Sequence, residues 1–310
     1  MSEHILNIRS NTHRPDGSPL QVKKYDVEHT TTYEYTNTVE NSTHTIRLQP
    51  KEDLAQDVMR SEISVSVEGE EQAQYDDVFG NQALYYVINK PYTRLEISCK
   101  SQIAIYEKLP DSRSPLVRKT SIPLAWMPWQ RQMMSAYLLP PELPEANLKT
   151  LIDFAMSFVE RNDYNLIQTL RDMNLRLYQD FTYEQGSTSL TTTPYDVFVS
   201  RKGVCQDFAN LFICLARLLG IPARYRMGYI YTGAEYTNKI QSDASHAWVE
   251  TYLPFLGWKG FDPTNGCMAE QNHIRVACGR NYRDATPTTG TIYKGGGNES
   301  LTISVKVKQI

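Results

Sequence analysis

The sequence has few cysteines, and their spacing suits neither a metal site nor a disulfide framework. Its 310 residues include five cysteines with no Cys-x-x-Cys pair, and an odd number argues against a full disulfide framework. Cys267 and Cys278 could pair with each other, but free thiols are expected in a reducing compartment. No acidic cluster has the spacing of a calcium-binding loop. We therefore expect no metal ion and no cofactor.

Long apolar runs and an excess of one charge are also absent. No run is long enough to span a bilayer, and the amino terminus carries no apolar segment of signal-peptide length. The net charge of -3, from 32 Lys and Arg against 35 Asp and Glu, provides no broad basic field for nucleic acid. We therefore predict a cytoplasmic protein that binds neither nucleic acid nor a membrane. The sequence makes no prediction of oligomeric state.

A helix with a cysteine in its first turn is the central element of the chain. Apolar residues recur with the spacing of a broadly buried helix at Phe208, Ala209, Phe212, Ile213, Leu215, Ala216 and Leu219. Gly203 precedes this run, and Gly220 and Pro222 end it. In the first turn, exposed N–H groups and the helix dipole favour a thiolate. Cys205 is therefore a candidate nucleophile, although buried cysteines more often serve as small apolar residues.

A hairpin further along the chain holds a histidine and an aspartate. Two runs rich in β-branched and aromatic residues flank a short Pro/Gly loop, which predicts antiparallel pairing. His246 and Asp262 each stand eight positions from Pro254 in this loop, so we expect direct pairing on one face. An aspartate there accepts the imidazole N–H and fixes its tautomer, whereas a one-residue slip would separate the two faces. With Cys205, this order suits Cys-His-Asp chemistry.

Four motifs in this order resemble the transglutaminase-like superfamily. They are G-V-C-Q-D-F-A at 203–209, G-I-P-A-R-Y at 220–225 followed by G-Y at 228–229, H-A-W at 246–248 and F-D-P-T at 261–264. The chain is most similar to bacterial members that carry an additional N-terminal β domain. This resemblance implies a papain-like core of helices packed on an antiparallel sheet. It also implies a catalytic triad of Cys205, His246 and Asp262.

The length suits two domains, at roughly one domain per 150 residues. Short alternating strands, including separate strands at 25–35 and 43–48, have the spacing of a β-sandwich. Amphipathic helices are predicted at 148–159 and 166–177, and a final strand with outward lysines at 301–308. We therefore predict an α+β protein with an irregular tail at 1–20, an N-terminal β-sandwich domain at 21–107, a proline-rich connector at 108–143 and a transglutaminase-like catalytic domain at 144–310.

The triad predicts acyl transfer through a thioester. Cys205 would attack a peptide or carboxamide carbonyl, and His246 would protonate the leaving amine and then activate the second nucleophile. Asp262 would orient His246 and stabilise its cation. The Cys205 backbone N–H supplies one donor to the oxyanion. Tyr183 and Gln185 are candidates for the second donor.

The identity of the second nucleophile stays open at this point. The favoured hypothesis is a cysteine protease or amidase that acts on a protein or peptide substrate, with water resolving the thioester. The alternative is a transglutaminase that passes the acyl group to a lysine or another amine. A third hypothesis is a non-catalytic scaffold for protein interactions. The absence of a calcium-loop pattern weighs against a calcium-activated transglutaminase.

Overall fold

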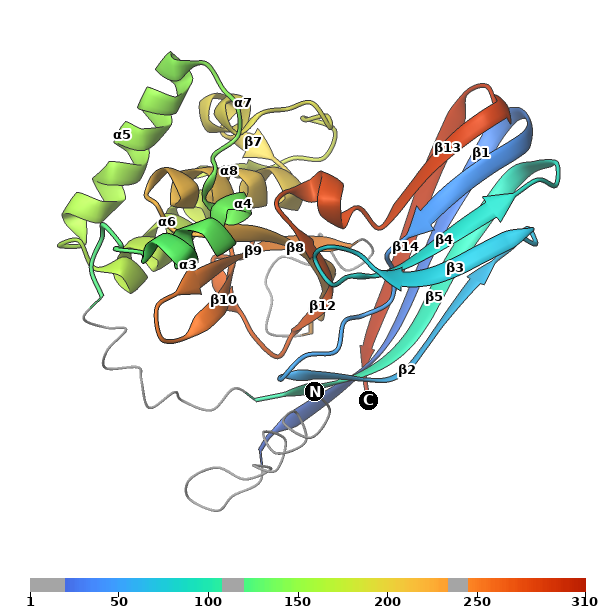
Figure 1. Cartoon of the computed structure of the whole chain (residues 1–310), viewed down its shortest axis with the longest axis horizontal. Coiled ribbons are helices and arrows are strands. Elements are labelled where there is room, and N and C mark those ends of the chain that lie inside the picture. Colours follow the sequence, from blue (N-terminus) through green and yellow to red (C-terminus); the bar gives the residue numbers. More distant parts are fainter. Residues whose placement is uncertain (1–19, 108–119, 234–244) are drawn as a thin grey trace.

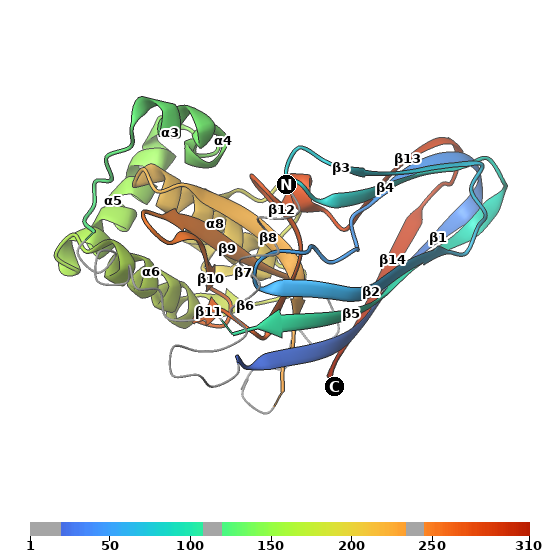
Figure 2. The same ribbon diagram turned by 60° about the horizontal axis from the view of Figure 1, so that its bottom comes forward.

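The computed structural model describes residues 20–107, 120–233 and 245–310 (Figure 1). The predicted tail at 1–20 therefore lies almost wholly outside the described residues, as does the first part of the connector at 108–143. The architecture is α+β, as predicted. A group of helices packs on one antiparallel sheet, and a longer, curled antiparallel sheet stands beside it (Figures 1 and 2).

The larger sheet is organised around one long strand, β1 (Val22–Ile46). Its path runs in the order β2 (Gln56–Val65), β5 (Tyr92–Tyr106), β1, β4 (Gln82–Ile88) and β3 (Glu71–Asp76), and β13 (Thr288–Gly295) and β14 (Glu299–Gln309) also pair with β1. The first half of β1 lies between β5 and β14, and its second half lies between β4 and β13. The carboxyl-terminal hairpin therefore joins the sheet that the first strand opens.

The predicted pair of separate strands at 25–35 and 43–48 is wrong, because residues 25–35 and 43–46 belong to the single strand β1, which ends at Ile46. An irregularity between Glu34 and Val39 interrupts the pairing with β5, and such irregularities let a strand bend. The strands are consequently hydrogen-bonded into one curled sheet instead of the two separate sheets of a β-sandwich. The curl still encloses an apolar cluster, which includes Ile46, Leu95 and Ile97.

The smaller sheet carries the helices. Its order is β11 (Cys267–Ala269), β10 (Gly257–Asp262), β9 (His246–Leu253), β8 (Ala223–Ile230) and β12 (His273–Gly279). The helices are α3 (Pro128–Met133), α4 (Ser135–Leu138), α5 (Glu145–Arg161), α6 (Leu166–Asp180), α7 (Pro194–Ser200) and α8 (Cys205–Leu218), with a 3-10 turn η2 (Tyr282–Ala285). The short strands β6 (Thr182–Tyr183) and β7 (Lys202–Gly203) precede α8. The helices predicted at 148–159 and 166–177 are confirmed within α5 and α6. No helix in the described ranges is both long and apolar enough to cross a membrane.

Helix α8 is buried on most of its surface because it lies between other elements. It contacts α5, α6 and α7 as well as strands β8 and β9, and Phe212 stacks on Phe261 of β10 with ring centroids 5.6 Å apart. The chain turns away from the helix at Gly220, whose φ of 71° is in the left-handed region. This packing fixes the start of α8 against the sheet that holds the hairpin.

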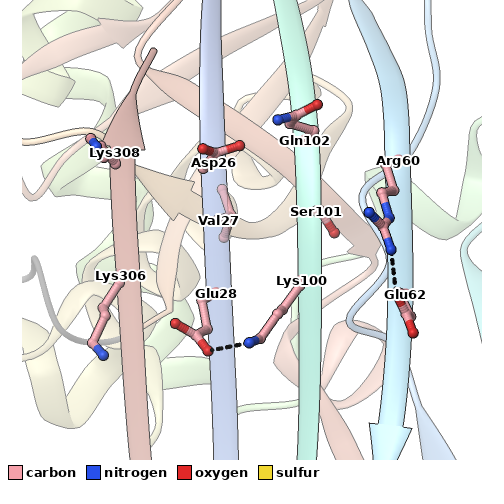
Figure 3. Close-up of a pocket in the computed structure, with 10 residues that line it drawn as sticks. All are labelled: Asp26, Val27, Glu28, Arg60, Glu62, Lys100, Ser101, Gln102, Lys306 and Lys308. Atoms are coloured by element: carbon pink, nitrogen blue, oxygen red, sulfur yellow. Dashed lines mark hydrogen bonds and ion pairs between the residues drawn. The ribbon is translucent and has the colours of Figure 1, made fainter.

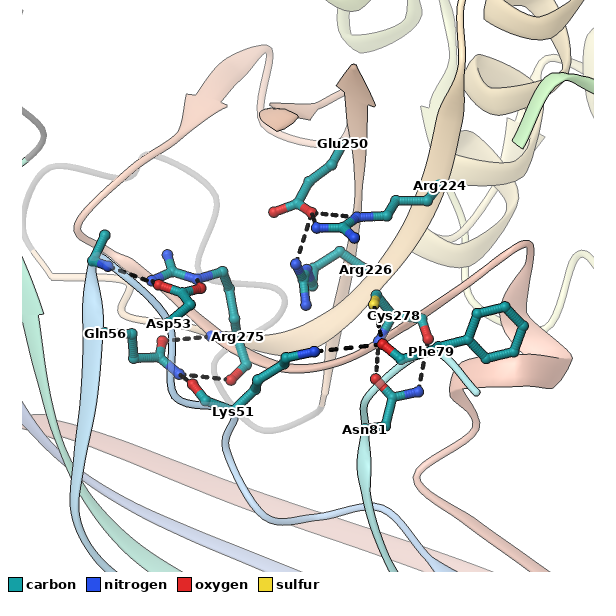
Figure 4. Close-up of polar contacts among 11 residues, drawn as sticks. Lys51, Asp53, Gln56, Phe79, Asn81, Arg224, Arg226, Glu250, Arg275 and Cys278 are labelled. Atoms are coloured by element: carbon teal, nitrogen blue, oxygen red, sulfur yellow. Dashed lines mark hydrogen bonds and ion pairs between the residues drawn. The ribbon is translucent and has the colours of Figure 1, made fainter. Parts of the chain in front are cut away.

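Side-chain amides connect the two sheets at the outer edge of β12 (Figure 4). The Gln56 carboxamide donates to the Arg275 carbonyl and accepts from the Arg275 N–H, both at 2.8 Å. Asn81 makes the same two bonds to Cys278, both at 2.7 Å, and Asp53 binds the Arg275 guanidinium at 2.6 and 2.9 Å. Buried backbone groups require partners, so these side chains substitute for a neighbouring strand and hold β12 against the larger sheet.

Candidate active site

Cys205 is the first residue of α8, as the sequence predicts. The Asp207 carboxylate accepts hydrogen bonds from the Val204 N–H at 2.8 Å and from the Thr188 hydroxyl at 2.7 Å. A Cβ on the buried Gly203 would lie 2.8 Å from the Asp207 Cβ, so this close turn requires glycine. The hydrogen bond from the Val204 N–H to the Asp207 carboxylate fixes the first turn of α8. Cys205 remains partly exposed.

His246 and Asp262 are brought together by the hairpin of β9 and β10. The His246 Nε2 lies 2.7 Å from the Asp262 Oδ2, and both side chains are fully buried. The predicted direct pairing is wrong, because the register pairs Phe261 with Val249, which places Asp262 level with Trp248. A slip of two positions keeps both side chains on the same face. His246 and Asp262 are therefore diagonal neighbours on β9 and β10, and not directly opposite residues.

Asp262 is held by donors on both carboxylate oxygens. Oδ1 accepts from the backbone N–H groups of Thr264 at 3.0 Å and Asn265 at 3.2 Å. Oδ2 accepts from the Asn265 side chain at 2.7 Å and from the His273 Nε2 at 3.0 Å. Burial alone would raise the pKa of Asp262, but the charge of His246 and these hydrogen bonds hold that pKa well below its usual range. The carboxylate is therefore ionised.

Asp262 in turn favours the protonated form of His246. Burial alone would lower the pKa of His246, but the Asp262 charge and hydrogen bond, and the nearby Cys205 thiol, raise that pKa above its usual range. The His246 Nδ1 has no hydrogen-bond partner among the residues that the structure describes. Nδ1 is thus the ring atom available to exchange a proton with Cys205.

Cys205 and His246 line a cavity of about 360 Å³. Tyr183 and Gln185, the two candidates for a second oxyanion donor, line the same cavity. The larger sheet contributes another part of the wall through side chains of β1 and β14, namely Thr31, Tyr33, Leu301 and Ile303. The cavity therefore lies between the two sheets.

A second cavity, of about 520 Å³, lies against the larger sheet (Figure 3). It is lined by side chains of both charges, and some of these pair with each other: Glu28 with Lys100 at 3.1 Å and Arg60 with Glu62 at 2.9 Å. Among the residues that the structure describes, neither cysteine nor histidine lines it. Its serine and lysines, such as Ser101 and Lys100, therefore have no histidine beside them in this cavity to act as a general base, whereas the Cys205 cavity holds both a thiol and an imidazole.

His273 is a buried neighbour of the triad that the sequence did not reveal. It begins β12 and donates to the carboxylate that also binds His246. Burial lowers the pKa of His273, so its ring is neutral at pH 7. The Trp248 ring packs against both histidines, with centroids 5.9 Å from His246 and 5.2 Å from His273. Because β12 reaches the site through tertiary packing, no local spacing could have identified His273.

The two histidines and the aspartate also place possible metal ligands within 4.8 Å of one another. However, the Nε2–Oδ2 distances of 2.7 Å for His246 and 3.0 Å for His273 are hydrogen-bond distances. Neighbouring ligands around a tetrahedral ion with bonds of ~2.0 Å lie about 3.3 Å apart. The geometry of Asp262 therefore fits hydrogen bonding better than metal coordination.

A cysteine at the start of a buried helix, against an antiparallel sheet that carries a histidine and an aspartate, defines the papain-like class of folds. The family model of the transglutaminase-like superfamily matches residues 153–263. The model of the bacterial transglutaminase-like N-terminal region matches residues 25–104. An uncharacterized protein of Mycobacterium tuberculosis is 32% identical over 301 residues, which cover 92% of each chain. The chain therefore belongs to the transglutaminase-like superfamily.

Two further comparisons extend this result. The structure of a proposed cysteine protease from Cytophaga hutchinsonii superposes with a TM-score of 0.75 at 22% identity, covering 94% of this chain and 91% of that one. This likeness supports the whole fold, including the larger sheet. A protein-glutamine gamma-glutamyltransferase of Pseudomonas aeruginosa is 39% identical over 88 residues, which are 27% of this chain and 13% of that protein.

Proposed function

We propose that this protein is a cysteine-dependent amide hydrolase that cleaves peptide or carboxamide bonds in a protein or peptide substrate. The observation that carries this proposal is the order of three groups in one site. Cys205 starts a helix at the cavity, and His246 lines the same cavity with an Nδ1 that no described residue bonds. Buried Asp262 holds the other ring nitrogen at 2.7 Å. This arrangement suits a nucleophile, a general base and an orienting group.

The first half of the reaction forms a thioester. The Cys205 thiol gives its proton to the His246 Nδ1, and the sulfur attacks the substrate carbonyl to form a C–S bond. The negative charge that develops on the carbonyl oxygen accepts hydrogen bonds from the Cys205 N–H and from the Tyr183 hydroxyl or the Gln185 amide. His246 then returns the proton to the leaving amine as the C–N bond breaks. Asp262 stabilises the imidazolium throughout.

The second half regenerates the thiol. Water enters after the amine leaves, and the His246 Nδ1 accepts a proton from it while its oxygen attacks the thioester carbonyl. The C–S bond breaks, a carboxylic acid is released, and the proton returns to the Cys205 sulfur. In the alternative function, a primary amine takes the place of water and the product is a new amide. The 88-residue match to the glutamyltransferase favours this alternative specifically.

A single mass-spectrometric experiment tests the proposal. The protein is incubated with a library of glutamine-containing peptides, with and without a labelled primary amine, and Cys205→Ala serves as the control. Shortened or deamidated peptides are expected from the wild-type protein alone. Amine adducts as the main product would favour the transglutaminase alternative. Wild-type protein that leaves every peptide unchanged would contradict both, and would favour the scaffold hypothesis.

A further inference from the structure

The wall that the larger sheet contributes to the Cys205 cavity includes an edge strand. Within the described ranges, β14 pairs with β1 and with no other strand. Its residues Leu301 and Ile303 lie opposite Tyr33 and Thr31 of β1, and all four line the cavity together with Cys205. Figure 1 shows β14 on the side of the sheet that faces the helical part. The edge is therefore continuous with the candidate active site.

The hydrogen bonds between β14 and β1 show that the backbone groups of Leu301 and Ile303 point away from β1. The Thr36 N–H donates to the Asn298 carbonyl and the Ile310 N–H donates to the Lys24 carbonyl, both at 3.0 Å. Residues of an antiparallel strand alternate between bonding the neighbour and facing away from it. The even positions of β14 therefore bond β1, and the N–H and C=O groups of Leu301 and Ile303 point to the open edge.

The side chains of this segment are apolar and accessible. Leu301 is 51% exposed and Ile303 is 38% exposed, although both belong to the row that continues into the buried Val305. Tyr33 supplies an aromatic ring beside them and donates or accepts a hydrogen bond with the Thr288 hydroxyl at 2.5 Å. An exposed apolar surface at a cavity that holds a nucleophile is typical of a binding site.

The lysines of β14 lie at its other end, while Glu299 is its first residue. Proteins protect exposed edges with charged residues, especially lysine, and here Lys306 and Lys308 carry that charge beside Asp26 and Glu28 (Figure 3). The segment 300–304 contains Ser, Leu, Thr, Ile and Ser and no charged residue. The part of β14 that carries no charge of its own is thus the part that lines the Cys205 cavity.

We propose that an extended segment of a polypeptide substrate pairs with the β14 edge at Leu301 and Ile303 as an added strand. Its backbone bonds the outward N–H and C=O groups, and an apolar side chain packs on Leu301, Ile303 and Tyr33. This mode of recognition requires a flexible or unfolded segment with apolar residues near the reacting bond. The inference rests on the proposed function for the reaction at Cys205, but the binding step is independent of it.

Binding is measured with the inactive Cys205→Ala protein and a fluorescein-labelled peptide in which one glutamine is flanked by valine and threonine. We expect Leu301→Lys and Ile303→Lys each to weaken binding about tenfold in fluorescence anisotropy. Thr302→Lys is the matched control, because Thr302 is an exposed residue of the same strand on the opposite face. Two peptides are also compared, one N-methylated at the odd backbone positions and one at the even positions. Only the peptide whose methyl groups remove the N–H groups that face β14 should bind weakly.

Two results would overturn the inference: absence of binding to the Cys205→Ala protein, or equal binding by the lysine variants and by both N-methylated peptides. Circular dichroism of each variant separates loss of binding from loss of fold. The chemistry is followed separately with p-nitrophenyl acetate, which is too small to form a strand. An inert Cys205 together with intact, Leu301-dependent peptide binding would refute the proposed function and leave this inference standing.

Discussion

Replacing His273 tests whether the second histidine positions the triad. His273→Leu removes the Nε2–H that donates to the Asp262 Oδ2 at 3.0 Å and leaves an apolar side chain of similar size in a fully buried site. Asp262 keeps its bonds to His246, Thr264 and Asn265. We therefore expect the fold to persist while the carboxylate loses one of its restraints.

The expected decrease in kcat follows from the free energy of the lost hydrogen bond. Hydrogen bonds to charged groups contribute about 1.5–3 kcal/mol, and the remaining donors to Asp262 place this one near the lower end, at about 2 kcal/mol. If the whole loss falls on the transition state, kcat decreases about 30-fold, since about 1.4 kcal/mol is tenfold in rate. KM should change little, because His273 does not line the Cys205 cavity.

The assay is steady-state amide hydrolysis by the wild type, His273→Leu, His273→Gln and His44→Leu, with thermal unfolding of each. His273→Gln retains an N–H donor at a similar reach and should recover part of kcat. His44 is the matched control, since it is also buried and bonded to Ser42 at 3.0 Å but lies in the larger sheet. Equal kcat values for His273→Leu and the wild type, or an equal loss in His44→Leu, would refute the positioning role.

Three other predictions concern the support of the site. Asn81→Leu leaves the buried N–H and C=O of Cys278 in β12 without the Asn81 partner, so it should lower the free energy of unfolding by about 1–3 kcal/mol in urea titration; an unchanged midpoint would show that these two hydrogen bonds do not stabilise the packing of β12 on the larger sheet. Gly228→Ala should prevent folding or strongly lower the melting temperature, because its Cβ would lie 1.9 Å from the Ile274 carbonyl oxygen; a normal melting temperature would show that β8 and β12 can separate freely. Because Asp262 raises the pKa of His246, the proton for the leaving amine stays bound above the usual histidine pKa of about 6.5. The alkaline limb of kcat/KM should therefore lie above pH 7, and Asp262→Asn should move it to lower pH. A limb that does not move would show that the group titrating there is not His246.

The local parts of the site were predictable because local patterns determine them. Helical spacing and the flanking glycines placed Cys205 at the start of α8. The hairpin pattern predicted His246 and Asp262 on one face. The register, however, is set by the turn between β9 and β10, after which β10 begins at Gly257, where φ is 71°. A Pro/Gly loop allows several turn types, so composition could not distinguish direct from diagonal pairing.

The remaining features depend on contacts between distant parts of the chain. The amide bonds from Gln56 to Arg275 and from Asn81 to Cys278 join residues 219 and 197 positions apart. The same holds for β14, which pairs with β1 at the opposite end of the sequence. Alternation predicts that such strands exist and which face is apolar, but it does not specify the neighbouring strand.

The central claim is that the sulfur of Cys205 becomes acylated with the help of His246. The most direct test is acid quenching of the reaction with p-nitrophenyl acetate, followed by digestion and mass spectrometry. We predict an acetyl group on the peptide that contains Cys205, removable by neutral hydroxylamine and absent from His246→Ala. Acetylation spread evenly over the five cysteines, or unchanged labelling of Cys205 in His246→Ala, would contradict the account.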